Sequence, residues 1–183
     1  MGKVLLRLLL IVVAFGCVIA AIGYVLPRNY STSATITIEA PAADIFPDVN
    51  KTERWSLWSP WRPEVISDLS LSYEGPKEGE GAILKWEDPR PDQRFDGQMK
   101  ILKSDPMREI EFTANMGEIP MDGYFRFEED DGLTTVTWTA GGTLPSGVAY
   151  GWYGIVYNGW LQTELQMSLQ RLKERAERKS DKK

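Results

Sequence analysis

The chain has 183 residues with one cysteine and no histidine, a length that suits one domain of roughly 150 residues plus one appendage. Apolar residues make up 43% and charged residues 26%, the balance of an ordinary globular protein, which excludes a disordered or disulfide-stapled chain. The lack of histidine excludes Ser-His-Asp and Cys-His catalysis and histidine-based metal sites. A net charge of -5 offers no basic face to phosphates, so we expect no nucleic-acid partner.

The chain opens with a long apolar segment. Residues 8–26 include no charged side chain, and as a helix at about 1.5 Å per residue they span roughly 28 Å, close to the hydrocarbon core of a bilayer. The apolar run continues to Pro27 without the short core and small-residue cleavage site of a signal peptide. We therefore expect residues 1–27 to form an uncleaved transmembrane anchor. Cys17 is expected to be a small apolar residue of this helix rather than a lipid attachment site.

The charges around the apolar run predict its orientation. Lys3 and Arg7 precede the run, and only Arg28 follows it closely. The positive-inside bias therefore places the N-terminus in the cytoplasm and predicts a single-pass membrane protein. The soluble domain is then expected outside the cytoplasm, in the periplasm of a bacterial cell. Residues 28–32 form the expected linker, which is short enough to keep this domain within contact distance of the bilayer.

Beyond the linker, segments of alternating apolar and polar residues predict seven β-strands. They cover residues 33–39, 69–73, 82–87, 94–103, 108–114, 123–129 and 133–140. After the first strand we expect two short helices, over residues 42–50 and 52–58. The strands that follow have one apolar and one polar face, which is typical of an antiparallel sheet covered on one side only.

A long amphipathic helix is expected over residues 154–176. One apolar side chain recurs every three or four residues, which gives the helix a stripe able to cover the sheet. The stripe consists of Tyr157, Leu161, Leu165, Leu169, Leu172 and Ala176. Residues 179–183 form a basic tail with nothing to bury.

The order of these elements resembles the helix-grip fold of the START-like superfamily, also called SRPBCC, and in particular its polyketide cyclase/dehydrase and lipid-transport group. The local motifs that carry the resemblance are Ile36-Thr37-Ile38-Glu39-Ala40-Pro41, Trp58-Ser59-Pro60-Trp61, Gly79-Glu80-Gly81 with Trp86, and Thr135-Val136-Thr137-Trp138. The resemblance predicts an α+β domain over residues 33–178. The membrane helix is a departure, because most members of this superfamily are soluble.

The resemblance implies a cavity between the curved sheet and the C-terminal helix that binds a hydrophobic or lipid-like small molecule. Strand parity agrees, because it places most of the aromatic side chains on one face of the sheet. The expected ligand-binding residues are Trp58, Trp61, Tyr73, Trp86, Phe112, Phe125, Trp138 and Tyr157. The same residues would form a packed core if the interior were solid, and parity does not distinguish the two. Trp55, Trp58, Trp61 and Arg62 fit either a lid over the cavity or a plug that fixes the short helices to the sheet.

Two other functions stay open at this point. The first is a cyclase/dehydratase-like enzyme that uses polar groups in the cavity, and the second is a protein-interaction scaffold with a filled cavity. Acidic residues fall on outward positions of the strands or at turns, so we expect no catalytic residue, no metal site and no cofactor. The aromatic and glycine-rich residues 147–154 fit either contact with membrane headgroups or packing of the helix start against the sheet.

Overall fold

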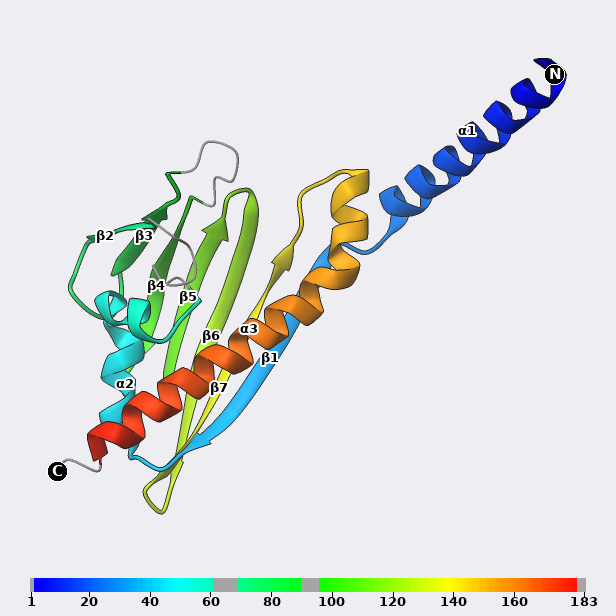
Figure 1. The fold of residues 1–183 in the computed structure, drawn as a ribbon. Coiled ribbons are helices and arrows are strands. Elements are labelled where there is room, and N and C mark those ends of the chain that lie inside the picture. Colours follow the sequence, from blue (N-terminus) through cyan, green and yellow to red (C-terminus); the bar gives the residue numbers. More distant parts are fainter. Residues whose placement is uncertain (1, 61–68, 90–95, 181–183) are drawn as a thin grey trace.

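The computed structural model describes residues 2–60, 69–89 and 96–180. A seven-stranded sheet is crossed by a long C-terminal helix, and a second long helix projects from the body at the N-terminus (Figure 1). In chain order the elements are α1 (Gly2–Val25), β1 (Asn29–Ile38), α2 (Ala42–Asn50), the 3-10 helix η1 (Thr52–Leu57), β2 (Ser70–Glu74), β3 (Ile83–Glu87), β4 (Gly97–Asp105), β5 (Glu109–Met116), β6 (Ile119–Asp130), β7 (Leu133–Thr143) and α3 (Val148–Ser180).

The sheet has the order β1-β7-β6-β5-β4-β3-β2, and every neighbouring pair is antiparallel. The first strand of the chain pairs with the last, from Asn29 opposite Thr143 to Ile38 opposite Thr134. A register shift between Ile101 and Lys103 marks a bulge in β4, a feature that bends a strand and increases its twist. This topology confirms the predicted helix-grip arrangement of a sheet, two short helices and a long C-terminal helix.

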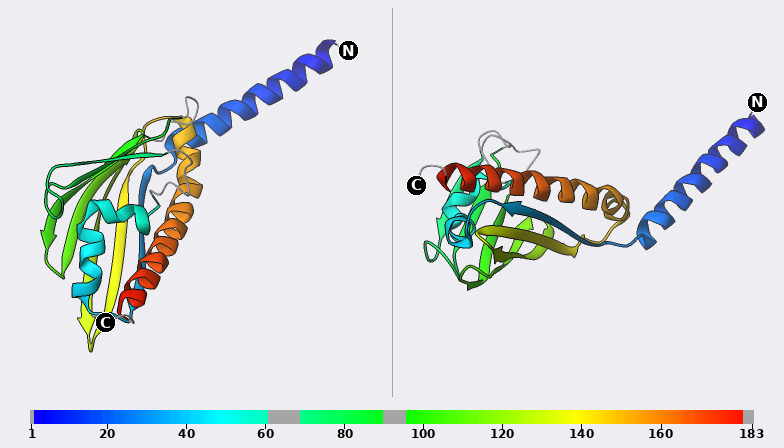
Figure 2. Two further views of the ribbon diagram at one scale, coloured as in Figure 1. Left: turned by 60° about the vertical axis from the view of Figure 1, so that its left-hand side comes forward. Right: turned by 90° about the horizontal axis from the view of Figure 1, so that it is seen from below.

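The C-terminal helix lies along one face of the sheet, as the two views in Figure 2 show. The six residues of the predicted stripe are at most 3% exposed, which confirms that this stripe faces the core. The strands supply the facing layer through their alternate buried residues, such as Ile110 and Phe112 in β5. The opposite face of the sheet is the polar one that the sequence pattern predicts.

Two elements begin earlier than the sequence pattern indicates. β1 starts at Asn29, inside the expected linker 28–32, because buried Tyr30 alternates with exposed neighbours and extends the ladder against β7. Helix α3 starts at Val148 instead of residue 154. Its first turns are rich in glycine, which weakens helix propensity, and they are stabilised by packing against the end of α1, where Gly151 meets Gly23. At its other end α3 extends to Ser180, into the expected tail.

Helix α1 is long and apolar enough to cross a membrane. Its most apolar 18-residue window has a mean hydropathy of 2.8, and none of that window is buried against the body. Residues 26–28 alone separate α1 from β1. The helix leaves the body at the end where α3 begins (Figure 1).

Candidate functional site

Five aromatic rings fill the space between the middle of the sheet and the short helices. Phe112, Phe125 and Trp138 come from β5, β6 and β7, while Trp55 and Trp58 come from η1 and its C-terminal end. Ring centroids lie 4.7 Å apart for Phe125 and Trp138 and 5.5 Å apart for Trp55 and Phe125. All five side chains are at most 1% exposed. These rings form a packed aromatic cluster.

Hydrogen bonds fix the two rings from η1. The indole N–H of Trp55 donates to the carbonyl oxygen of Val49 at 2.7 Å, and that of Trp58 donates to the carbonyl oxygen of Asp48 at 2.9 Å. Both acceptors lie in the last turn of α2. The Trp58 ring therefore packs among the other aromatic side chains with its only polar atom satisfied by the backbone.

Among the described residues, a small apolar cavity of about 20 Å³ lies between the sheet and α3. It is lined by Pro60, Met116, Met121, Trp138, Trp160, Leu161, Glu164 and Leu165. This volume holds about one water molecule. The buried Nε1 of Trp138 has no hydrogen-bond partner among the described residues, although a buried donor of this kind normally finds one. Trp138 therefore lines the cavity through apolar ring atoms, while its unpartnered N–H is buried within the wall.

The expected ligand-binding residues fall into three groups. Trp58, Phe112, Phe125 and Trp138 belong to the aromatic cluster, and Trp138 alone of these lines the cavity. Trp86 and Tyr157 are buried elsewhere in the core. Tyr73 is 40% exposed, because its strand β2 is the sheet edge farthest from β1, along which α3 packs. Trp61 lies outside the described residues.

Sequence reasoning missed most of the cavity wall. Met116 and Met121 lie at facing ends of β5 and β6, and Trp160 lies on α3, so only the tertiary fold brings them together. A local indication exists on the helix, where residues 160, 161, 164 and 165 share one face. Glu164 is the one ionisable side chain of the wall as described.

A pair of tyrosines lies where β1 meets α3. The rings of Tyr30 and Tyr157 are perpendicular with centroids 4.9 Å apart, and the Tyr30 hydroxyl donates to the carbonyl oxygen of Pro120. Burial raises the pKa of Tyr30 to about 12 and raises the pKa of Tyr157 as well. Both phenols therefore stay protonated at neutral pH, which makes them hydrogen-bond donors and poor bases.

The comparison with known sequences decides the family. Residues 30–177, well over half of the chain, match the family described as polyketide cyclase / dehydrase and lipid transport. The chain belongs to this family. The match agrees with the resemblance that the motifs indicate, and membership supports a ligand-binding or cyclase role. No curated protein matches the chain.

Solved structures share the fold of this family member. The di-domain ARO/CYC StfQ from the steffimycin biosynthetic pathway gives a TM-score of 0.63 at 11% identity, over 84% of this chain and 52% of that protein. A protein of unknown function from Staphylococcus aureus gives 0.63 at 10% identity, over 84% of this chain and 98% of that one. A protein from Thermus thermophilus gives 0.60 at 17% identity, over 82% and 99%. The chain thus spans about half the length of the di-domain protein, and likeness at these identities concerns the fold.

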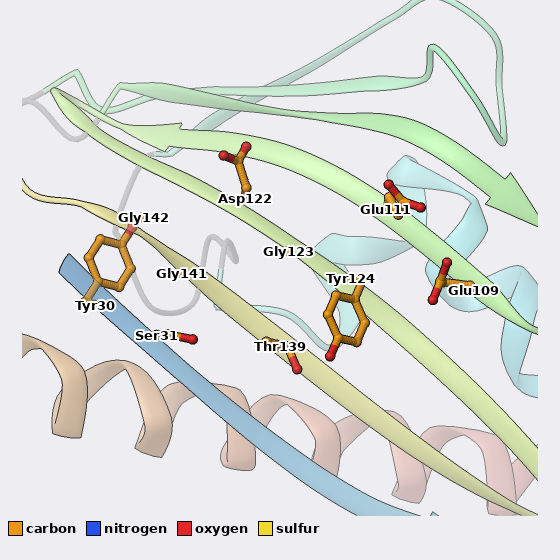
Figure 3. A pocket seen from close by; sticks show the side chains of 10 residues that line it. All are labelled: Tyr30, Ser31, Glu109, Glu111, Asp122, Gly123, Tyr124, Thr139, Gly141 and Gly142. Carbon is orange, nitrogen blue, oxygen red and sulfur yellow. The ribbon is translucent and has the colours of Figure 1, made fainter.

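A larger hollow lies on the polar face of the sheet. It has a volume of about 540 Å³, and Figure 3 shows the side chains of Glu109, Glu111, Asp122 and Tyr124 around it. Three of its lining residues are glycines without a side chain to fill it, Gly123 on β6 and Gly141 and Gly142 on β7. Hydrogen bonds from Arg126 and Lys103 hold the pKa of Glu109 below its usual value. The polar lining does not suit an apolar ligand.

The described residues contain no group of three His, Cys, Asp or Glu side chains placed to hold a metal ion.

Proposed function

We propose that this member of the family is a membrane-anchored protein that binds an apolar or lipid-like small molecule between the sheet and α3. The observation that carries the proposal is an apolar cavity beside Trp138, a residue whose buried Nε1–H has no acceptor among the described residues and would become reachable only when the cavity widens. A ligand oxygen would supply the acceptor and recover the free energy lost by an unsatisfied buried group. The ligand class is accordingly an apolar molecule with one carbonyl, ester or ether oxygen.

The cavity must widen to admit such a molecule, because 20 Å³ is far below the volume of a lipid-like ligand. Its wall is suited to this change. Met116 and Met121 have unbranched, polarisable side chains that repack easily. Trp160 is 45% exposed and can swing outward without leaving a buried void. These three side chains are the movable part of the wall.

The apolar helix α1 supports the anchored part of the proposal. Its length and composition fit one bilayer crossing. Lys3 and Arg7 ahead of the apolar run support an N-terminus in the cytoplasm and a domain outside it. Fusion of a cytoplasm-dependent and a periplasm-dependent reporter to Lys183 tests the orientation. Activity of the periplasmic reporter alone is expected, and activity of the cytoplasmic reporter alone overturns this placement.

Native mass spectrometry of the full chain, extracted from membranes in mild detergent, tests the binding function. We expect a fraction of the chain to retain a bound mass that organic extraction removes. Trp138→Phe keeps a ring in place but removes the donor, so its retained fraction should fall about tenfold if the hydrogen bond is made. Trp55→Phe is the matched control, because its N–H is already bonded to Val49, and it should retain the ligand. Absence of bound mass in the unaltered chain, together with a stable protein partner, would instead favour the scaffold function.

A cyclase/dehydratase-like reaction is the second candidate, favoured by family membership together with Glu164, the ionisable residue among those that line the cavity. A carboxylate beside a bound apolar substrate can transfer a proton, which is the chemistry that such reactions need. Glu164→Gln separates the two functions. If the Glu164→Gln variant loses turnover but retains the ligand, the enzyme function is supported. If the unaltered chain and the variant retain the ligand equally and neither shows turnover, binding alone is supported.

A further inference from the structure

The first half of α3 is uncharged and exposes apolar side chains. Residues 132–163 contain no Asp, Glu, Lys or Arg, whereas residues 164–180 contain eight of them. On this first half the exposed fraction is 60% for Ile155 and 63% for Val156. We call the exposed residues here the apolar face. It consists of Trp152, Tyr153, Ile155, Val156 and Trp160.

The exposure of the two tryptophans of this face is unusual among the described tryptophans. Six tryptophans are described, and those outside the apolar face, Trp55, Trp58, Trp86 and Trp138, are at most 1% exposed. Trp152 and Trp160 are 38% and 45% exposed. A contiguous apolar surface with two exposed indoles normally marks a surface that another apolar phase covers. An occupant of this face therefore has to be apolar, and it has to tolerate the polar edge of an indole.

Contacts between α3 and α1 show that the apolar face begins next to the helix proposed to cross the membrane. The indole N–H of Trp152 donates to the carbonyl oxygen of Ile19 at 3.2 Å. Gly151 approaches the backbone of Gly23 so closely that a Cβ atom on Gly151 would lie 1.8 Å from the Gly23 carbonyl oxygen. The start of α3 is thus in direct contact with the body end of α1, and Figures 1 and 2 show the two helices meeting there.

The position of α1 in a bilayer then sets the depth of α3. If α1 spans the hydrocarbon core, residues 19–25 at its body end lie near the boundary with the headgroups. Trp152 touches this segment, and α3 then runs away from α1 (Figure 1), so that Trp160 lies about 12 Å farther along the helix at 1.5 Å per residue. Tryptophan and tyrosine are the side chains that favour the headgroup layer, where an apolar ring and a polar edge are both accommodated.

We infer that the apolar face of α3 lies in the headgroup layer of the same membrane that α1 crosses. The inference rests on the membrane anchoring in the proposed function. A lipid surface suits the face better than a second copy of the chain, because the face is continuous with a helix that already has lipid as its surroundings. Trp160 also lines the cavity, so one of the three movable side chains of the cavity wall faces lipid. An apolar ligand can then pass between bilayer and cavity without crossing water.

Spin labelling of the full chain in phosphatidylcholine nanodiscs tests the inference. The natural Cys17 in α1 reports on the anchor. In a Cys17→Ala background, Val156→Cys reports on the apolar face, and Gln170→Cys, exposed on the charged half of the same helix, is the matched control. The measurement is the accessibility of each label to oxygen, which concentrates in lipid, relative to a water-soluble nickel complex. We expect this ratio to be several-fold higher at positions 17 and 156 than at position 170.

The outcomes separate the failure of the inference from the failure of the anchor. A lipid-like ratio at position 17 with a water-like ratio at position 156 overturns the inference and leaves the anchor in place. A water-like ratio at position 17 overturns the anchor and with it the inference. Spin–spin coupling between labels at position 156 that disappears on dilution with unlabelled chain shows a second copy on the face, and this also overturns the inference.

Discussion

The Nε atom of Arg175 on α3 lies 3.1 Å from Oδ2 of Asp48 on α2. The same carboxylate pairs with Arg54 of η1 at 2.9 Å and with Lys179 of α3. Asp48 is fully buried, while its three partners remain partly exposed. Because the backbone carbonyl of Asp48 also accepts the Trp58 indole N–H, this residue joins the aromatic cluster to the end of α3.

Asp48→Asn is expected to destabilise the fold strongly. The change removes the buried negative charge and leaves three cations around a neutral amide. Because removal of one partner from a buried ion pair is strongly destabilising, the free energy of unfolding should fall by about 3 kcal/mol. The unfolding midpoint of the full chain in detergent checks the value. Asp131→Asn is the control, because this exposed turn residue has a positive φ that asparagine also adopts. A loss below about 0.5 kcal/mol at position 48 would contradict a role for this ion-pair network.

The two hydrogen-bonding states of buried tryptophan give a second prediction. Trp55→Phe leaves the Val49 carbonyl without its donor, whereas Trp138→Phe breaks no hydrogen bond among the described residues. Both changes remove similar ring area from the core. In protein freed of lipid, Trp55→Phe should therefore cost about 1 kcal/mol more stability than Trp138→Phe. Equal losses in the two unfolding midpoints would show that Trp138 has an acceptor after all.

Local periodicity predicts most of the fold, because burial on one face of a strand or helix repeats along the sequence. The stripe from Tyr157 to Ala176 and the buried alternation in β5 are of this kind. Tyr73 shows the limit of the method. Its parity is that of an inward residue, but exposure depends on how far α3 reaches across the sheet, and β2 is the edge strand at the far side.

The candidate site is less predictable from the sequence. It depends on the volume left between packed side chains and on which buried polar atoms find a hydrogen-bond partner in the fold. Sequence parity places Phe112, Phe125 and Trp138 on one face, but the sequence leaves open whether Trp55 and Trp58 form a lid over a cavity or pack directly against these rings, as they do in the fold. Likewise, the unpartnered N–H of Trp138 emerges only when the indoles are compared in the fold. The apolar start of α3 is visible in the sequence, but its contact with α1 is not.

Stability should fall in alkaline solution through Tyr30. Burial raises its pKa in the folded state to about 12, from 10.0 for a free side chain. Below pH about 10 both states keep this proton, so its contribution to stability is constant. Between pH about 10 and about 12 the unfolded chain releases the proton first, and the free energy of unfolding falls by about 2 to 3 kcal/mol. Tyr30→Phe should make this decline shallower in unfolding midpoints measured across that range. An unchanged slope would show that Tyr30 does not titrate abnormally.

The contact between α1 and α3 can be tested by replacing each of two glycines of α3 with alanine in separate variants. A Cβ atom on Gly151 would collide with the Gly23 carbonyl, whereas a Cβ atom on Gly159 would meet nothing within 4 Å. Gly159→Ala should therefore stabilise the helix by up to about 1 kcal/mol, the usual difference in helix propensity. Gly151→Ala has the same propensity gain, but it forces the two helices apart.

Spin-label distances between Cys17 and a cysteine at Gln170 measure the result. The chain with both glycines intact and the Gly159→Ala variant should each give one narrow distance distribution, because α1 is fixed against α3 through Gly23 and Trp152. Gly151→Ala should broaden it, since residues 26–28 then become the main restraint on α1. If the distribution stays narrow in Gly151→Ala, the connection rather than the glycine contact fixes the angle of the anchor.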